Sequence, residues 1–243
     1  MNIYEVKPIS ERIRGNSYVG RGIVMGRSSD GRRALAAYFI LGRSANSRNR
    51  IFAVKNGELF TEPFDPAKVR DPSLIIYAAV RQFENKLIVT NGNQTDTVYE
   101  GLQAGKSFSE ALTARCFEPD APNFTPRISG LFTLDAEKPS YELNILKSVD
   151  AEGSDCARFT FAYPAKPGLG HFLHTYVCDG NPIPTFQGEP ERISVGDDVD
   201  AFTAELWDAL DPDNKISLYV RTVDLETGRT EERLINKNQQ EAP

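Results

Sequence analysis

The chain has 243 residues, of which 40% are hydrophobic and 26% are charged, and its 28 Lys and Arg residues against 34 Asp and Glu give a net charge of −6. A chain of this length and composition buries a substantial core. The acidic balance argues against nucleic acid as a partner, because nucleic-acid-binding domains usually carry a basic stripe. No apolar run approaches the roughly 18 residues of a membrane span, and no signal-peptide segment opens the chain. We therefore expect no membrane association and a cytoplasmic location.

Short β-type runs dominate the first half of the chain. Asn56-Gly57 is the strongest hairpin dipeptide, and Ser29-Asp30-Gly31 supplies another turn between two apolar runs. The run at 73–83 is rich in β-branched and aromatic residues, so we favour a strand over a buried helix there. The strands predicted in this half are residues 18–25, 34–41, 51–54, 58–61, 73–83 and 87–90.

Helical periodicity follows these strands, and the strand pattern then returns. Residues 97–104 and 107–116 have apolar positions at helical spacing, and Ser107 followed by Glu110 forms a capping-box pattern. A further amphipathic helix is predicted at 198–210, with Asp197 or Asp198 as its N-cap. The remaining predictions are strands at 127–134, 141–146, 156–162, 216–225 and 231–236, an irregular connection at 164–190 and a polar tail at 237–243.

The order of these elements predicts the fold class. Strands occur in clusters with a few helices between them, which is typical of an α+β protein with antiparallel sheets. Because no helix follows each strand, a Rossmann fold or a TIM barrel is disfavoured. No low-complexity linker and no short-period repeat divides the chain, so we predict one domain over residues 1–243.

An arginine-rich segment between residues 18 and 50 is the clearest candidate for a binding site. Its arginines are interleaved with Gly, Ser and Asn. A guanidinium binds phosphate through two parallel hydrogen bonds, and hydroxyl, amide and glycine N–H groups add neutral donors. In an acidic chain this concentration indicates a site for a small anion such as a nucleotide phosphate. A solvated charged loop is the alternative.

Two further polar segments follow along the chain. Seven polar side chains surround Gly92 between residues 90 and 97, where a strand ends and a helix begins with unsatisfied N–H groups. A simple N-cap explains one of these residues but not all of them. Residues 118–127 form a proline-rich connection between a helix and a strand. A rigid loop without further function is the alternative for this connection.

Metal and covalent chemistry are poorly supported by the sequence. Cys116, Cys156 and Cys178 are far apart and form no CxxC pair, which favours reduced thiols in core positions. His171 and His174 are the only histidines, and no third His or Cys lies close to them in sequence. The chain also contains no G-x-S-x-G nucleophile elbow. We expect neither a metal nor another cofactor.

The arginine-rich segment, the Gly92 segment and the proline-rich segment together resemble one family. Their order and approximate spacing are similar to those of the archaeal-type IMP cyclohydrolases, over residues 18–130 in particular. Relative to that family, the chain has an N-terminal extension at residues 1–17 and a longer C-terminal half. The motifs are Tyr18-x-Gly20-Arg21, Gly26-Arg27-Ser28-x-Asp30-Gly31, Arg43-Ser44-x-x-Ser47-Arg48-Asn49-Arg50, Asn91-Gly92-Asn93-Gln94-Thr95-Asp96 and Thr125-Pro126-Arg127-Ile128.

The resemblance implies a fold and a reaction. The fold is a four-layer αββα sandwich of antiparallel sheets, similar to that of the N-terminal nucleophile hydrolases. The reaction is the dehydrative ring closure of 5-formamidoimidazole-4-carboxamide ribonucleotide (FAICAR) to IMP, the last step of de novo purine biosynthesis. The substrate supplies its own nucleophile, so the enzyme needs no cofactor and no covalent residue. The implied ligand is this nucleotide, and whether the chain forms a homo-oligomer stays open.

The resemblance also implies roles for individual residues. Arg48, or Arg50 in its place, is expected to contact the oxyanion or the carboxamide. Tyr77 is expected to transfer protons, and Glu118 to act as the catalytic carboxylate. Without such roles, Tyr77 is a core tyrosine and Glu118 a surface residue at a helix end. The expected substrate-binding residues are Arg21, Arg27, Arg43, Ser44, Arg50, Asn91, Asn93, Asp96 and Arg127.

Two other functions stay open at this point. A non-catalytic purine-nucleotide-binding protein would keep the arginines and lose the proton-transfer groups, whereas Tyr77 and Glu118 are both present. An amide hydrolase of the same fold would need Cys, Ser or Thr at a mature N-terminus. Ser10 and Ser17 are the only early candidates for that nucleophile.

Overall fold

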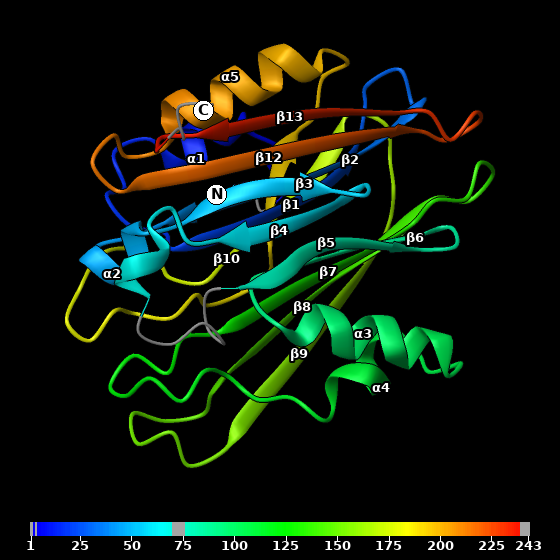
Figure 1. The fold of residues 1–243 in the computed structure, drawn as a ribbon. Coiled ribbons are helices and arrows are strands. Elements are labelled where there is room, and N and C mark those ends of the chain that lie inside the picture. The colour runs from blue at the N-terminus through cyan, green and yellow to red at the C-terminus, as the bar shows by residue number, and fades with distance from the viewer. Residues whose placement is uncertain (1, 3, 70–75, 239–243) are drawn as a thin grey trace.

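The computed structural model describes residues 2, 4–69 and 76–238. Within these residues the chain forms two antiparallel sheets and a few short helices (Figure 1). The predicted α+β class is therefore confirmed. The two sheets face each other, and the largest cluster of buried apolar side chains contains residues of both.

One sheet has six strands, and the arginine-bearing strand β1 lies in its interior. β1 pairs with β2 along the hairpin and with β10 on its other side. A strand with a neighbour on each side is held rigidly along its length, so it fixes the positions of the side chains at its two ends. The order across the sheet is β11 (Glu191–Ser194), β10 (Leu169–His174), β1 (Arg21–Arg27), β2 (Arg33–Leu41), β12 (Lys215–Asp224) and β13 (Thr230–Asn236).

The other sheet has seven strands that lie side by side in chain order. Asn56 and Gly57 have φ values of 53° and 78°, as the tight hairpin between β3 and β4 requires. β6 and β7 are neighbours although two helices and the proline-rich connection separate them in sequence. The strands are β3 (Ile51–Lys55), β4 (Glu58–Glu62), β5 (Tyr77–Phe83), β6 (Lys86–Thr90), β7 (Arg127–Thr133), β8 (Ser140–Ser148) and β9 (Cys156–Pro164).

The side chains of β2 alternate between two cores. Tyr38 and Ile40 belong to the cluster between the sheets, whereas Phe39 and Leu41 belong to a cluster on the outer face of the six-stranded sheet. Successive side chains of a strand point to opposite faces. Because large apolar side chains occupy both faces, each face needs a cover, and the helices supply it on the outside.

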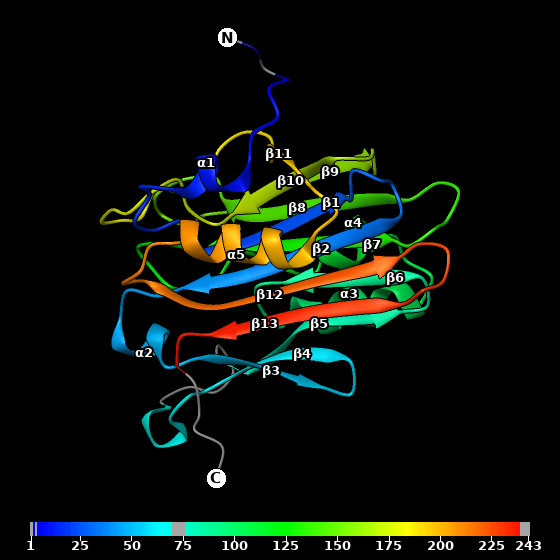
Figure 2. The ribbon, with the colours of Figure 1, turned by 90° about the horizontal axis from the view of Figure 1, so that it is seen from above.

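Helices cover the outer faces of both sheets (Figures 1 and 2). α1 (Ile9–Ile13) and α5 (Val199–Ala209) share the outer apolar cluster of the six-stranded sheet. α3 (Gln94–Gln103) and α4 (Phe108–Leu112) pack on the seven-stranded sheet against Ile88 of β6 and Leu131 of β7. The short helix α2 (Ala45–Arg48) precedes the β3–β4 hairpin, and the 3₁₀ helix η1 (Pro66–Lys68) follows it.

Most of the predicted elements are present. The hairpins at 29–31 and 56–57, the capping box of Ser107 and Glu110 and the N-cap Asp198 are confirmed. The strand predicted at 73–83 is confirmed from Tyr77 onward, and residues 73–75 lie outside the described residues. Of the predicted tail at 237–243, residues 239–243 lie outside them as well. The short helices α1 and α2 were not predicted.

Two predictions are wrong. Residues 164–190 are not an irregular connection throughout, because β10 lies there beside β1. Gly170 hides this strand in the sequence: a Cβ at this position would meet Val195 Cγ2 at 2.8 Å, so the close packing requires glycine. The cysteines do not occupy core positions either. Cys116 and Cys178 are exposed, and Cys156 is half-buried.

Candidate functional site

A cavity of about 490 Å³ opens at the end of the molecule where β1 begins. Four parts of the chain meet there: the start of β1, the connection from β2 through α2 to β3, the proline-rich connection before β7, and the segment after β10. The arginine-rich and proline-rich segments are thus brought together. The lining residues that bear on function are Tyr18, Arg21, Arg43, Ser44, Arg50, Glu118, Asp120, Thr125 and Tyr176.

Two guanidinium groups enter this cavity without protein partners. Arg21 begins β1, and Arg50 stands between α2 and β3 with 8% of its surface exposed. Among the described residues, neither side chain has a hydrogen-bond partner, and Nε of Arg50 is fully buried. Buried donors are nearly always paired in folded proteins. Buried Arg50 and half-buried Arg21, both without partners, therefore indicate a site for an anionic or strongly polar ligand.

The two arginines influence each other's charge. Burial and the nearby Arg21 lower the pKa of Arg50. Burial acts on Arg21 in the same direction, but Tyr18 and Glu118 outweigh it and raise the pKa of Arg21 above its usual value. Guanidinium groups stay protonated in proteins. Both side chains are cations at neutral pH, and Glu118 is a carboxyl group whose charge acts on both of them.

A pair of buried tyrosines lies beside the arginines. Tyr38 of β2 and Tyr77 of β5 come from opposite sheets, and their hydroxyls share a hydrogen bond of 2.9 Å. Burial and then Tyr77 raise the pKa of Tyr38 well above its usual value, whereas Arg21 and Arg50 oppose this rise. Two linked hydroxyls next to two cations are suited to hold or move a proton.

Glu118 is the carboxyl group that faces the arginines. Its N–H donates to the carbonyl of Thr125 at 2.9 Å, which fixes the proline-rich connection, and its Oε1 lies 3.9 Å from Nη1 of Arg127. Burial raises the pKa of Glu118, although Arg21 and Arg127 act against this rise. A carboxyl group whose pKa is shifted by burial in a cavity is a candidate for proton transfer.

The Gly92 segment holds Arg127 in place. Nη1 of Arg127 donates to Oε1 of Gln94 at 2.9 Å, and Nε2 of Gln94 donates to Oδ1 of Asn91 at 2.9 Å. Oδ1 of Asn91 also accepts from the N–H of Ile128 at 2.9 Å. A Cβ at Gly92 would meet Nη1 of Arg127 at 2.5 Å, so glycine leaves room for the guanidinium. Asn91 thereby positions Arg127, which in turn lies beside Glu118.

Arg43 stands at the rim of the cavity. Its guanidinium lies over the ring of Tyr18, 5.1 Å from the centroid, and forms an ion pair with Asp179. Ser44 follows it as the N-cap of α2, and its hydroxyl accepts from the N–H of Ser47 at 3.1 Å. The side chain of Arg43 is 35% exposed, so the rim presents a cation that a ligand can reach from solvent.

Three residues that sequence reasoning did not single out complete the site. They are Tyr38, described above, and Tyr176 and Asp120. The hydroxyl of Tyr176 shares a hydrogen bond of 2.6 Å with Oγ1 of Thr125, which itself donates to Asp120. Burial raises the pKa of Tyr176 to about 12. No local sequence signal distinguishes these tyrosines from core tyrosines, because only the tertiary fold brings Tyr176 to the cavity and Tyr38 close to Arg21 and Arg50.

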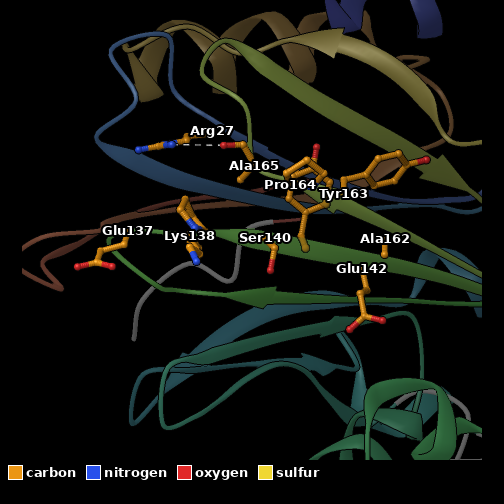
Figure 3. Close-up of a pocket in the computed structure, with 11 residues that line it drawn as sticks. Arg27, Glu137, Lys138, Ser140, Glu142, Ala162, Tyr163, Pro164 and Ala165 are labelled. Atoms are coloured by element: carbon orange, nitrogen blue, oxygen red, sulfur yellow. Dashed lines mark hydrogen bonds between the residues drawn. The ribbon is translucent and has the colours of Figure 1, made fainter.

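Arg27, predicted as a substrate-binding residue, lies at the other end of β1. Six residues of antiparallel strand separate it from Arg21, which corresponds to about 20 Å. There it borders a groove of about 700 Å³ formed by the start of β8 and the end of β9 (Figure 3). Its Nε donates to the carbonyl of Gly31 at 2.6 Å and its Nη1 to that of Ala165 at 3.4 Å. The structure does not bring Arg27 to the cavity.

Three more predicted residues point elsewhere. Arg48 is exposed, and its guanidinium donates to the carbonyl of Gly42 and to Oδ1 of Asn214, both at 3.0 Å. Asp96 forms an ion pair of 2.9 Å with an arginine of β5. Asn93 accepts a long hydrogen bond from an arginine that follows α4. Of the two arginines that the motif left open, Arg50 is the one that lines the cavity.

The two histidines are engaged within the protein. Nδ1 of His171 lies 2.7 Å from the hydroxyl of Tyr141, and burial lowers the pKa of His171 to about 4, with a smaller contribution from Arg192. Nδ1 of His174 lies 2.7 Å from the carbonyl of Tyr176. In the part of the chain that the structure describes, no group of three or more His, Cys, Asp or Glu residues could hold a metal ion. No described helix is long and apolar enough to cross a membrane.

The charge of the cavity suits a small anionic ligand, and its carboxyl and hydroxyl groups suit proton transfer. Sequence comparisons identify the family of this chain. A model of the IMP cyclohydrolase-like protein family matches residues 18–228. The IMP cyclohydrolase of Methanopyrus kandleri is 33% identical over 183 residues, which cover 70% of this chain and 89% of that protein. The chain belongs to the IMP cyclohydrolase-like family, and the resemblance inferred from the motifs is confirmed.

Other archaeal relatives agree with this assignment. The IMP cyclohydrolase of Methanothrix thermoacetophila is 30% identical over 118 residues, which cover 47% of this chain and 57% of that protein. That of Methanococcus aeolicus is 26% identical over 165 residues, or 66% of this chain and 75% of that protein.

Proposed function

We propose that this protein is an IMP cyclohydrolase that closes the ring of FAICAR with loss of water and releases IMP. The observation that carries this proposal is the pair of guanidinium groups of half-buried Arg21 and buried Arg50, which have no partner among the described residues and share a cavity with Glu118. Such an arrangement costs stability unless a polar or anionic ligand completes it. Membership of the family supplies the identity of that ligand.

The reaction needs two protons moved and one oxygen removed. The carboxamide nitrogen attacks the formyl carbon, which turns the formyl oxygen into an oxyanion. One proton leaves the carboxamide nitrogen, one leaves the formamido nitrogen, and both end on the departing water. A preorganised cation at the oxyanion and a proton carrier on each side of the ring are what an enzyme can contribute.

The residues that line the cavity, together with neighbours that lie behind its wall, divide into these roles. Arg50 and Arg21 stabilise the oxyanion and the carboxamide oxygen, which suits their depth and lack of partners. Glu118 accepts the proton of the attacking nitrogen, and the ion pair with Arg127 holds the Glu118 side chain in place. Tyr77, linked to Tyr38, protonates the leaving hydroxyl. Arg43 and Ser44 at the rim bind the 5′-phosphate.

The finer fold assignment is part of the same proposal. The helices on the outer faces of both sheets support a four-layer αββα sandwich similar to the N-terminal nucleophile hydrolases. The residues of the expected extension support a single domain, because Ile9 and Ile13 of α1 are fully buried in the same cluster as α5.

The experiment that tests the function is a direct assay of the purified protein with FAICAR, with IMP followed by absorbance and identified by mass. We expect turnover, and we expect Tyr77→Phe to retain IMP affinity while losing most of that turnover. Tight binding of IMP by the wild-type protein without any conversion of FAICAR would contradict the proposal, and would favour a non-catalytic nucleotide-binding protein.

A further inference from the structure

Two of the three cysteines lie next to each other, close to the catalytic cavity. Cys116 is exposed and lies two residues before the start of the proline-rich connection, and Cys156 is half-buried at the first position of β9. The thiol of Cys156 donates to the carbonyl of Ala157 at 3.6 Å and lies near the thiol of Cys116 and the N–H of Phe117. Forty residues separate the two cysteines in sequence, so the fold and not the local sequence brings them together.

A single guanidinium fixes the backbone on both sides of this pair. Nη2 of Arg158 donates to the carbonyl of Arg115 at 2.9 Å, and Nη1 of the same group donates to the carbonyl of Cys156 at 2.9 Å. Because the two nitrogens belong to one planar group, the residue before Cys116 and the residue Cys156 are held side by side. The backbone next to Cys116 and that of Cys156 are therefore held close together by the fold.

The same region is packed against the segment that carries Glu118. The ring of Phe117 contacts that of Phe124 edge to face, with centroids 5.5 Å apart. A Cβ at Gly153, in the loop between β8 and β9, would lie 2.6 Å from the Phe124 ring, so this loop presses closely on the connection. Glu118 follows Cys116 by only two residues. Cys116 and Glu118 therefore belong to one short, closely packed stretch of the chain.

We propose that Cys116 and Cys156 form a reversible disulfide when the protein meets hydrogen peroxide, and that this bond regulates the site by displacing Glu118. Exposed Cys116 reacts first: its thiolate attacks a peroxide oxygen, the O–O bond breaks, and a sulfenic acid and one water result. The thiolate of Cys156 then attacks the sulfenic sulfur, the S–O bond breaks and a second water leaves. Two electrons pass from the two thiols to the peroxide, and their two protons end in the waters.

The regulatory part of this inference rests on the proposed function. Formation of the disulfide draws residue 116 toward β9 and changes the position of Glu118 relative to Arg21 and Arg50. Displacement of a reacting group by about 1 Å can cost roughly 100-fold in rate. We expect the oxidised protein to have a kcat lowered by roughly tenfold or more, with full recovery after treatment with dithiothreitol.

The test treats the purified full chain with hydrogen peroxide, blocks the remaining thiols by alkylation and digests without reduction. We expect a cross-linked tryptic pair of peptides 116–127 and 148–158, whereas peptide 159–192, which contains Cys178, carries the alkyl group. Cys178→Ser is the matched control and should form the same cross-link. Cys116→Ser and Cys156→Ser should not form it, and their FAICAR turnover should resist peroxide.

The outcomes separate the two parts of the inference. A wild-type protein in which Cys116 goes to sulfinic acid, or pairs with Cys178, without the 116–156 link overturns the proposal. A link that forms without changing turnover overturns the regulatory part alone. Mass spectrometry detects the cross-linked peptides whether or not the protein is active. A protein without any FAICAR turnover would therefore contradict the proposed function, while the presence or absence of the 116–156 cross-link would still test the disulfide.

Discussion

The cavity and the groove lie at opposite ends of the same strand, and they differ in how their polar groups are paired. In the groove near Arg27, both donating nitrogens of that side chain reach backbone carbonyls, and the hydroxyl of Tyr163 donates to Glu189 at 3.3 Å. In the cavity, Arg21 and Arg50 have no hydrogen-bond partner among the described residues. The groove is larger, about 700 Å³ against about 490 Å³.

This difference shows why volume alone does not locate a functional site. A groove whose polar groups are already paired gains little from a ligand, because each new hydrogen bond replaces one that the protein or water already supplies. Buried donors without partners gain much more. The unpaired groups of the smaller cavity therefore lower the stability of the ligand-free protein, whereas the paired groups of the groove do not.

The largest effect is expected for Arg50→Met, which removes the buried cation and keeps much of its volume. Loss of a donor that stabilises an oxyanion costs roughly 10²- to 10³-fold in kcat. Because Arg50 is buried without a partner, its removal should leave the melting temperature unchanged or raise it. Rates and thermal unfolding are measured together, with Arg48→Met as the matched control. An equal drop in turnover for Arg48→Met and Arg50→Met would contradict the assignment of the oxyanion contact to Arg50 alone.

Tyr77→Phe is expected to lower kcat by about 100-fold, since it removes a proton-transfer group. It also leaves the buried hydroxyl of Tyr38 without its partner, which costs about 1–3 kcal/mol of unfolding free energy. The measured melting temperature checks that the protein stays folded during the assay. Tyr163→Phe in the groove is the control and should keep wild-type turnover. A Tyr77→Phe protein with full turnover would make this tyrosine a core residue only.

Glu118→Gln should change the pH profile. Burial raises the pKa of Glu118, so its carboxylate forms at a higher pH than an ordinary glutamate. If the carboxylate accepts the proton of the attacking nitrogen, kcat rises as the pH rises through this raised pKa and then levels off. Glu118→Gln should lack this acidic limb. At the plateau its rate should be roughly 100-fold lower than that of the wild-type protein, which is the lower end of the range for the loss of one proton-transfer group. An unchanged limb in the variant would assign it to another group.

The sequence predicted the strands that border the site better than the site itself. Turn residues such as Asn56-Gly57 act locally, so their hairpins could be recognised, and the motifs identified the family. The choice between Arg48 and Arg50 could not be made, because it depends on where α2 ends and β3 begins. Arg21 and Arg27 look alike in sequence and differ only in the end of β1 at which they stand. Strand β10 was missed because its glycine serves close packing rather than a turn.

The smallest effect, and the most direct comparison of the two regions, comes from Arg43→Ala and Arg27→Ala. Arg43 stands at the rim, half-exposed, at a distance from the reacting atoms if it binds the 5′-phosphate. Such a contact stabilises the bound substrate and the transition state equally, so its loss raises KM and leaves kcat unchanged. A charge-assisted hydrogen bond contributes about 1.5–3 kcal/mol, which corresponds to roughly a tenfold or greater rise in KM.

Arg27→Ala should change neither constant, because its guanidinium only holds backbone carbonyls beside the groove. Steady-state kinetics with FAICAR at constant ionic strength measures both variants. A rise in KM for Arg27→Ala as large as that for Arg43→Ala would mean that the groove also takes part in binding the nucleotide.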